Sequence, residues 1–462
     1  MTTLPVGWAP KSLSDVCLPV TKADPVSTGR EQVRYVDIGS VDGARHRLPE
    51  IPWIDSGSAP SRCRQIIAGG DTVFSTVRPY LEKIAFVDGS LDGEFASTGF
   101  CVLRPGPQLL PRYLFHFSVS HQMLEQVLIH QRGVSYPAVL EKDVKAATIP
   151  VPPLDEQRRI VDILEDHLSR LDAAETLLNQ SKRRLATWSR AVVDTAFWDS
   201  ALIAEPERDE LVESLMRSRK SRWSQSPSGK QSKAPVVADL ETFREAQPWP
   251  VVSLESATDP NRTIRYGILK PSIGQGGTVR YVEVRDLAGN TLSDKTFRLT
   301  SRQLDEQFSA SRLAGGDVVI AVRGSYERTA VVPKELNGAN LSRDVARIAP
   351  LPELLPGLLH YWLQTSSSKA YLNRHARGVA VKGVNISTLR AMPVPLLPLE
   401  TQRHIVDTLN TQLAAGDRAT LEIDRAAKLS ETLRRSLLAA AFAGRLTGLA
   451  SDMEIVEDMA GV

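Results

Sequence analysis

The sequence predicts an α+β protein built as a tandem repeat, in which two α+β domains are separated by two long helices that form an antiparallel coiled coil. Three observations support this fold class. The segments PLDEQRRIVDIL (153–164) and PLETQRHIVDTL (398–409) are identical at eight of twelve positions. The blocks that precede them match each other at the same offset of about 245 residues. Each segment also begins an apolar pattern that is too long for an ordinary globular helix.

The composition is typical of a soluble globular protein, with 462 residues, 42% hydrophobic and 24% charged, and the length favours two to four domains. No apolar run approaches the roughly 18 residues of a membrane span. The initial stretch MTTLPVGWAPKSLSD lacks the pattern of a secretory leader. The three cysteines are far apart in the chain, which predicts reduced thiols. We therefore expect a cytoplasmic protein.

Charge is distributed unevenly between the copies, although the net charge of the chain is only +2. Residues 1–150 contain 15 Lys/Arg and 15 Asp/Glu, whereas residues 247–395 contain 19 and 12, a balance of +7. The second block is basic enough to favour a polyanionic partner. The first block would need its arginines clustered on one face to do the same.

Each copy begins with a segment that predicts an α+β domain, over residues 1–153 and 247–397. The matched sequences VRYVDI (33–38) and VRYVEV (279–284) alternate like half-buried strands. In both copies an AGGD sequence predicts a tight turn before a further strand, because glycine accepts a positive φ. Residues 110–128 and 355–373 have the apolar spacing of helices.

The second part of each copy predicts a long helix, over residues 154–198 and 398–448. A proline-rich extended stretch precedes each, and Asp155 or Glu400 lies in the first turn, where a negative charge suits the helix dipole. About forty helical residues extend roughly 60 Å at 1.5 Å per residue. The apolar stripe of a helix usually faces a globular core, but this length favours packing of the two helices on each other.

The predicted helix-pair interface consists of apolar residues at alternating steps of three and four. They are Val161, Leu164, Leu168, Leu171, Leu178, Leu185, Val406, Leu409, Leu413, Ile423, Leu433 and Leu437.

Residues 199–246 predict a linker, in which ERDELVESLMRSRK (207–220) favours a short helix and SQSPSGKQSK (224–233) favours a mobile segment. The basic run RSRKSRW (217–223) is typical of a solvated surface, with a phosphate or partner contact as the alternative. Residues 449–462 predict a disordered acidic tail.

No constellation of catalytic residues is found. The chain has no GxxxxGK[ST] loop, no Asn/Asp-Pro-Pro-aromatic tetrapeptide of amino-methyltransferases, and no His or Cys spacing typical of a metal site. We therefore expect a non-catalytic protein that carries no cofactor or metal.

The alternation of two α+β domains with two helices that open on P-L-x-x-Q-R-x-I-V-x-x-L resembles the specificity subunit of type I restriction–modification systems. LPVGW (4–8), the AGGD-strand-Arg stretches and AAFAGRLTG (440–448) support the resemblance, which covers nearly the whole chain. It implies that each domain is a target recognition domain for one half of a bipartite, asymmetric DNA sequence. It also implies that the helix pair sets the half-site spacing and docks two modification subunits that carry out DNA methylation.

The resemblance further implies two restriction (nuclease-translocase) subunits in the full restriction system. S-adenosylmethionine is then expected on the modification subunits, and ATP and Mg²⁺ on the restriction subunits.

Sequence-specific contact with double-stranded DNA needs side chains that reach base edges from exposed loops. The candidates lie on the loops after the glycine turns and on a second pair of matched loops. They are Ser75, Arg78, Tyr80, Lys83, Arg132, Ser135 and Tyr136 in the first copy, and Arg323, Ser325, Tyr326, Arg328, Arg377, Lys382 and Asn385 in the second. A solvent-exposed loop arginine or a buried tyrosine is the alternative for each residue. For the whole chain, the alternatives are a coiled-coil scaffold with two protein-binding heads, or an enzyme with an unrecognised active site.

Overall fold

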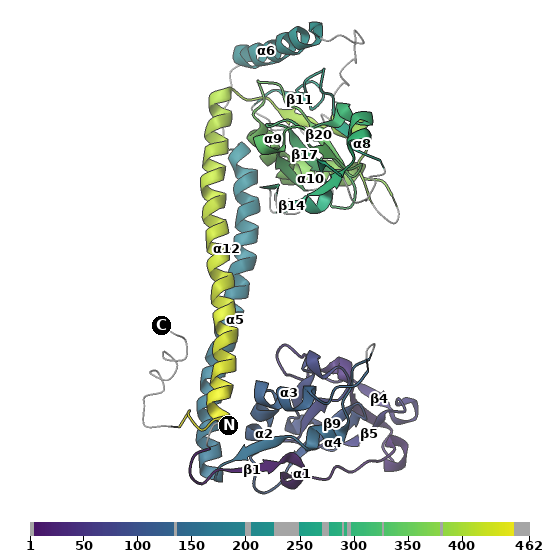
Figure 1. The fold of residues 1–462 in the computed structure, drawn as a ribbon, viewed down its shortest axis with the longest axis vertical. Coiled ribbons are helices and arrows are strands. Elements are labelled where there is room, and N and C mark those ends of the chain that lie inside the picture. Colours follow the sequence, from purple (N-terminus) through teal and green to yellow (C-terminus); the bar gives the residue numbers. More distant parts are fainter. Residues whose placement is uncertain are drawn as a thin grey trace. The chain divides into compact units, whose positions relative to one another are not determined.

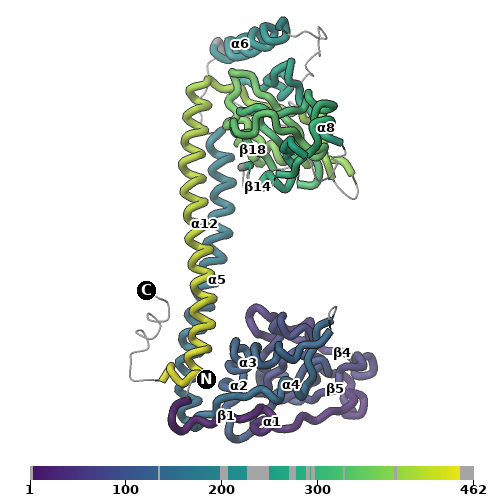
Figure 2. Tube along the Cα trace, in the orientation of Figure 1, coloured from purple at the N-terminus to yellow at the C-terminus, as the bar shows by residue number. Residues whose placement is uncertain are grey.

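The structure is a computed structural model that describes residues 4–133, 136–198, 205–225, 249–269, 277–288, 291–292, 297–325, 328–378 and 382–447. The chain divides into two compact units (Figures 1 and 2). Unit 1 comprises Met1–Ser181 with Glu422–Val462, and unit 2 comprises Lys182–Leu421. Each unit therefore contains one α+β head, the beginning of one long helix and the end of the other. We call residues 4–153 head 1 and residues 249–397 head 2.

Head 1 contains two four-stranded sheets and a short strand pair. The first sheet has the order β2-β9-β6-β7 and is antiparallel, and the second has the order β4-β3-β8-β5 with β3 and β8 parallel. Strands β1 and β10 pair separately and bring the entry of the chain beside the start of the long helix. The strands are β1 (Ala9–Ser12), β2 (Cys17–Leu18), β3 (Gln32–Val36), β4 (Trp53–Asp55), β5 (Cys63–Ile66), β6 (Thr72–Ser75), β7 (Ile84–Phe86), β8 (Phe95–Ser97), β9 (Phe100–Pro105) and β10 (Thr148–Val151). The helices are α1 (Leu13–Val16), α2 (Pro111–Ser118), α3 (His121–Leu128) and α4 (Glu141–Lys145).

Head 2 repeats this plan among its described residues. The sheet β12-β20-β17-β18 corresponds to β2-β9-β6-β7, the sheet β16-β13-β19 corresponds to β4-β3-β8, and β11 pairs with β21 as β1 does with β10. The strands are β11 (Val251–Ser253), β12 (Arg265–Tyr266), β13 (Val279–Val282), β14 (Leu287–Ala288), β15 (Thr291–Leu292), β16 (Arg298–Thr300), β17 (Val318–Ala321), β18 (Thr329–Val331), β19 (Asn340–Leu341), β20 (Val345–Ile348) and β21 (Pro393–Pro395). The helices are α8 (Arg302–Gln307), α9 (Pro356–Gln364), α10 (Ser366–His375) and α11 (Ile386–Ala391). The strands predicted at 33–38 and 279–284 are present as β3 and β13.

Each helical stretch predicted from apolar spacing forms two helices. Ser120 and Thr365 are the N-caps of α3 and α10, and their side chains accept hydrogen bonds from the backbone N–H groups of Met123 and Ser368. A side-chain cap of this kind satisfies a backbone donor that would otherwise have no partner, and so begins a new helix.

The long helices are α5 (Leu154–Trp198) and α12 (Leu399–Phe442), of 45 and 44 residues. The prediction that the second helix continues to residue 448 is wrong, because the chain turns after Phe442 and Gly444 adopts a φ of +70°. A Cβ on Gly444 would lie 2.2 Å from Pro5 Cγ, so the chain entry packs tightly on this turn and requires glycine there.

The helix α6 (Glu205–Ser224) lies within the predicted linker and is longer than the short helix expected there. Arg219 donates hydrogen bonds to the backbone carbonyls of Glu255 and Thr258, and Arg222 pairs with Asp259 at 2.8 Å. The basic run is therefore partly structural, because two of its arginines hold α6 against head 2. Residues 226–233 of the predicted mobile segment and the predicted tail 449–462 lie outside the described residues.

The repeated motif contributes a buried glutamine at the start of each long helix. In α5, Gln157 is fully buried; its Oε1 accepts from the Leu110 N–H at 2.8 Å, and its Nε2 donates to two backbone carbonyls. In α12, Gln402 makes the matching bonds with the Leu355 N–H and with the carbonyls of Glu353 and Leu397. The same motif occurs twice because each head uses this glutamine to join its α2 or α9 helix to a long helix.

The two long helices contact each other inside each unit. In unit 1, Asp172 of α5 accepts hydrogen bonds from Arg434 of α12 and from Arg47 of head 1. In unit 2, a Cβ on Gly416 of α12 would lie 2.8 Å from Trp188 Cζ3 of α5, so the indole packs where only glycine leaves room.

All twelve predicted interface residues are buried or half-buried. Toward the helix ends the apolar faces also pack into the heads, as Leu164 and Leu437 do in the core of unit 1. The pattern did not identify Ile160, Ile405 and Phe442, which are buried as well.

His360 in α9 makes the stability of unit 2 depend on pH. Its burial lowers its pKa from 6.5 to about 4. Between these values the unfolded chain binds a proton that the folded chain does not, so acidification favours unfolding. We expect the free energy of unfolding to fall by up to about 3 kcal/mol as the pH drops from about 6.5 to 4.

The first copy supplies a non-titrating replacement, because Phe115 and Ile84 match His360 and its partner Thr329 at the repeat offset of 245. Urea unfolding of the His360→Phe/Thr329→Ile variant should lose this acid dependence. The exposed His404 serves as the control, since its replacement by Gln should leave the dependence unchanged. Equal pH dependence in the wild type and the double variant would contradict the prediction.

Candidate nucleic-acid interface

Two predicted loop sets meet in head 1. The loop after β6 and the loop between α3 and α4 are joined by backbone hydrogen bonds, from the Arg78 N–H to the Pro137 carbonyl at 2.7 Å and from the Val139 N–H to the Thr76 carbonyl at 2.9 Å. The second loop is closed on itself, because Arg132 and Ala138 exchange two backbone hydrogen bonds. We call residues 75–83 with 129–140 junction 1.

Head 2 contains the same arrangement. The Gly324 N–H donates to the Lys382 carbonyl at 3.0 Å, and the Val384 N–H donates to the Val322 carbonyl at 2.8 Å. Arg377 and Gly383 exchange two backbone hydrogen bonds, as Arg132 and Ala138 do. We call residues 321–328 with 376–385 junction 2. In each head the structure thus brings together two loops whose hydrogen-bonded residues are more than 50 positions apart in sequence.

The prediction that Ser75 contacts DNA is wrong. Ser75 is only 1% exposed, and its hydroxyl donates to the Val77 carbonyl at 2.8 Å. Lys83 is half-buried, and its ammonium donates to the Val41 carbonyl. These two side chains support junction 1 from the inside.

Among the other described candidates of junction 1, Tyr80, Arg132 and Tyr136 are exposed and Arg78 is half-buried. Tyr80 is 48% exposed and Tyr136 is 72% exposed. Arg78 has its guanidinium 5.0 Å from the Tyr136 ring centroid, a cation–π geometry. Arg132 is exposed, with Nη2 3.8 Å from Asp143 Oδ2. Ser135 lies outside the described residues.

Junction 2 presents mainly exposed polar side chains. Those exposed are Arg323, Ser325, Arg328, Arg377, Lys382 and Asn385, whereas Tyr326 lies outside the described residues. Asn385 is better explained as the N-cap of α11, because its Oδ1 accepts from the Thr388 N–H at 2.8 Å.

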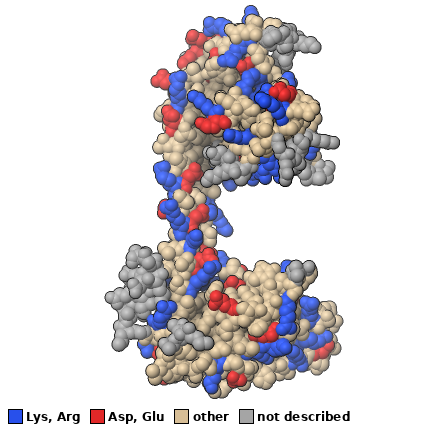
Figure 3. Space-filling view, viewed as in Figure 1, with Lys and Arg blue, Asp and Glu red and all other residues tan. Residues whose placement is uncertain are grey.

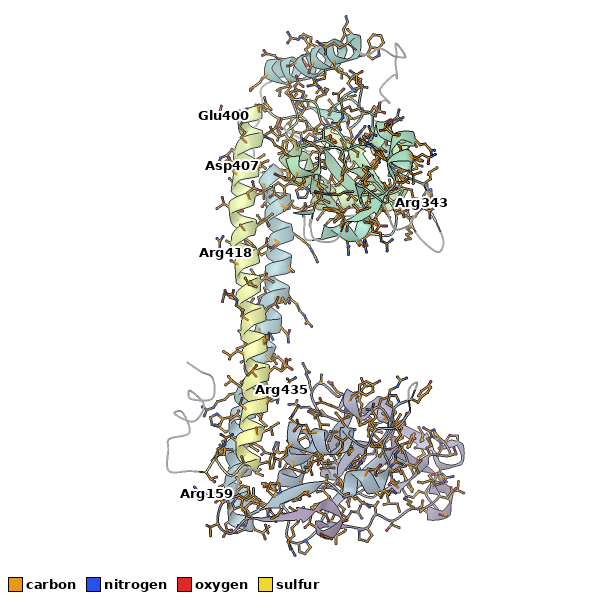
Figure 4. All side chains as sticks on the ribbon, viewed as in Figure 1. Arg159, Arg343, Glu400, Asp407, Arg418 and Arg435 are labelled. Carbon is orange, nitrogen blue, oxygen red and sulfur yellow. The ribbon has the colours of Figure 1, made fainter. Side chains whose placement is uncertain are left out.

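Sequence reasoning missed Arg343, which is exposed just before β20 (Figure 4). Its Nε lies 3.7 Å from Asp344 Oδ1, and Arg323 Nε lies 3.8 Å from the same oxygen. The repeat offset pairs Arg343 with Thr98, so a search for arginines on matched loops passes over it. The Arg-Asp sequence before a strand was the available signal.

Charge alone does not locate an interface in the view of Figure 3, where Lys and Arg side chains lie among Asp and Glu on both heads. Pairing is more informative. Most arginines of head 1 contact carboxylates, as Arg30 and Arg34 do with Glu94 and as Arg104 does with Asp71. Arg78 has no carboxylate within 4 Å in the described part of the chain.

Two residues of junction 1, Arg78 and Glu82, have a positive φ, which is unfavourable for a residue with a Cβ. Only three of the described non-glycine residues have a positive φ, and all three are in head 1: His46 (50°), Arg78 (48°) and Glu82 (49°). A residue with a Cβ costs about 1–2 kcal/mol in this conformation. Residues held this way concentrate at binding sites.

The described residues contain no group of three or more His, Cys, Asp or Glu side chains that could hold a metal ion. No helix among them has an apolar stretch long enough to cross a membrane.

The sequence matches a family model described as the type I restriction modification DNA specificity domain, over residues 5–183 and 266–421. It is 23% identical over 373 residues to the EcoBI specificity subunit of Escherichia coli, covering 77% of this chain and 73% of that one. It is 22% identical over 353 residues to the EcoKI specificity subunit of Escherichia coli strain K12, covering 75% and 68%.

Two solved structures are similar to this chain over nearly its whole length. One is a chain from a study of complex assembly and conformational transition of the type I R-M system, with a TM-score of 0.75, 26% identity, and coverage of 96% of this chain and 100% of that one. The other is the HsdS subunit from Thermoanaerobacter tengcongensis, with a TM-score of 0.54, 28% identity, and coverage of 96% and 98%.

Proposed function

This chain belongs to the type I restriction–modification DNA specificity family, and from that premise we propose that it recognises a bipartite, asymmetric DNA target for a methyltransferase and endonuclease complex. One observation carries the proposal: each head has the same junction of two loops, built on matched hydrogen bonds but with different exposed side chains. Two loop junctions with the same backbone hydrogen bonds but different exposed side chains can contact two different DNA half-sites.

We propose that junctions 1 and 2 are the DNA-contacting surfaces. In junction 1 these are Arg78, Tyr80, Arg132 and Tyr136, with Ser135 retained from the sequence. In junction 2 they are Arg323, Ser325, Arg328, Arg377 and Lys382, with Tyr326 retained from the sequence and Arg343 added. Arginine and lysine supply both phosphate contacts and base-edge donors, and tyrosine can stack or donate a hydrogen bond.

We further propose that α5 and α12 form an antiparallel coiled coil that sets the half-site spacing. The apolar spacing along both helices, the half-buried Leu178, Leu185 and Ile423, and the Trp188–Gly416 contact support this role. Glu400, Asp407 and Arg418 project from the exposed side of α12 and offer polar contacts for the two modification subunits (Figure 4). The proposed cofactors of the complex belong to its partner subunits: S-adenosylmethionine on the modification subunits, and ATP and Mg²⁺ on restriction subunits. The proposed location is the cytoplasm.

Footprinting of DNA by the chain assembled with its modification subunits tests the function. We expect two short protected tracts, separated by a stretch in which base changes do not alter binding, since each head contacts one half-site. A single continuous tract would contradict the bipartite assignment. Absence of DNA binding even at low salt would instead favour the scaffold with protein-binding heads, because phosphate contacts strengthen as salt falls.

A further inference from the structure

Arg78 occupies a backbone position that suits glycine. In junction 2 the matching residue is Gly324, whose φ of +73° costs a glycine nothing. Both residues donate their N–H to the facing loop, Arg78 to the Pro137 carbonyl and Gly324 to the Lys382 carbonyl. The backbone hydrogen bonds that join the two loops are therefore the same with either residue, and they do not require the arginine side chain.

The Arg78 guanidinium is supported by an aromatic ring and has no nearby carboxylate among the described residues, so it is available to bind a ligand. The Tyr136 ring lies beneath it at 5.0 Å, and the described residues place no carboxylate within 4 Å to neutralise it. The loop that presents Tyr136 is tight at Gly133, whose φ is +91° and where a Cβ would lie 2.9 Å from the Tyr136 carbonyl oxygen. A strained backbone, an aromatic support and an unneutralised charge thus coincide on one half-buried side chain.

Junction 2 supplies its arginine differently. Arg323 corresponds to Val77, one position before the left-handed residue, and its Nε faces Asp344 at 3.8 Å. Two junctions with the same hydrogen-bonded frame therefore present a guanidinium from neighbouring backbone positions. The two arginines are not equivalent, although both follow an AGGD turn and a strand.

We propose that Arg78 is a specificity-determining residue of head 1, which recognises a guanine in the major groove through its N7 and O6 atoms, and that Tyr136 is its positioning residue. A bidentate arginine–guanine pair is the commonest specific contact between proteins and DNA. Stacking on Tyr136 restricts the guanidinium plane and reduces the freedom lost on binding. This inference rests on the proposed function.

The test uses the chain assembled with its modification subunits and DNA duplexes in which each base pair of the wild-type target is varied in turn. Replacing Arg78 with Gly installs the residue of the second copy, so the fold is retained with less backbone strain. We expect the Arg78→Gly assembly to lose discrimination at one G·C pair of one half-site by roughly 5- to 100-fold, with the other half-site unchanged. Arg78→Asn should behave the same way, because asparagine tolerates a positive φ but is too short to replace the contact.

Tyr136 variants test the positioning role. Tyr136→Phe should retain the discrimination, and Tyr136→Ala should weaken it at the same base pair only. Unchanged discrimination in Arg78→Gly, a target without guanine at the affected position, or equal loss across both half-sites would overturn the inference. A wild-type assembly that discriminates no sequence would overturn the proposed function itself, so the two failures are distinguishable.

Discussion

Replacing Gln402 with alanine is expected to lower the free energy of unfolding of unit 2 by about 3 kcal/mol. The side chain is fully buried and bonds the Leu355 N–H and the carbonyls of Glu353 and Leu397 at 2.7–2.8 Å. Alanine would leave three buried backbone groups without partners, each costing about 1–3 kcal/mol before relaxation. Hydrogen exchange of the α9 amides measures the loss where it occurs.

The same helix supplies a matched control. Gln412 is exposed on α12, so Gln412→Ala should change stability by less than about 0.5 kcal/mol. In unit 1, Gln157→Ala should destabilise α2 and leave α9 unaffected. Similar exchange rates in Gln402→Ala and Gln412→Ala would show that the repeated motif does not act through this glutamine.

Replacing Asp71 with alanine is expected to destabilise head 1 by about 3–5 kcal/mol, because it leaves an unpaired guanidinium in a largely buried site. Asp71 is 1% exposed, binds Arg104 through both oxygens at 2.9 and 2.7 Å, and accepts from the Ala68 N–H at 2.8 Å. The hydrogen bond with Asp71 raises the pKa of Arg104, which remains charged. The AGGD sequence is thus a turn whose aspartate anchors a neighbouring strand.

A double-mutant cycle separates the cost of the unpaired Arg104 charge from the cost of the lost hydrogen bond to the Ala68 N–H. Asp71→Ala/Arg104→Met should recover about 2 kcal/mol of the loss, since the unpaired charge is removed while the Ala68 N–H stays unsatisfied. Asp162→Ala, at an exposed position of α5, should have little effect. Additive effects of the two single substitutions would mean that the ion pair contributes nothing.

Local signals in the sequence predicted much of the fold. The long helices are visible because apolar spacing, preceding prolines and an acidic first turn all act within a few residues. The split between α2 and α3 was missed, although Ser120 is a recognisable N-cap, because the apolar spacing continues across it. The sequence did not predict that each long helix is shared between the two compact units, because an apolar stripe does not show which partner covers it.

The sequence predicted the loops of the candidate site, but it did not predict that two loops of each head lie side by side. Hydrogen bonds such as that from Arg78 to Pro137 join segments far apart in sequence, and no local pattern encodes them. Ser75 was misassigned because β6 lies between β7 and β9, where every residue of the strand is buried and the usual alternation of exposure disappears. Asn385 has a second explanation in the structure, because asparagine before a helix caps the backbone as readily as it contacts a base.

The division of the two units has a consequence for how the protein is made. Unit 2 is one continuous stretch, Lys182–Leu421, whereas unit 1 needs the segment from Glu422 onward. Head 1 leaves the ribosome early, but Ile160 and Leu164 share their core with Leu437 and Phe442, which are translated after unit 2. Unit 2 can therefore finish folding first although it is encoded second, and the nascent head 1 exposes an apolar surface until the segment from Glu422 onward has been made.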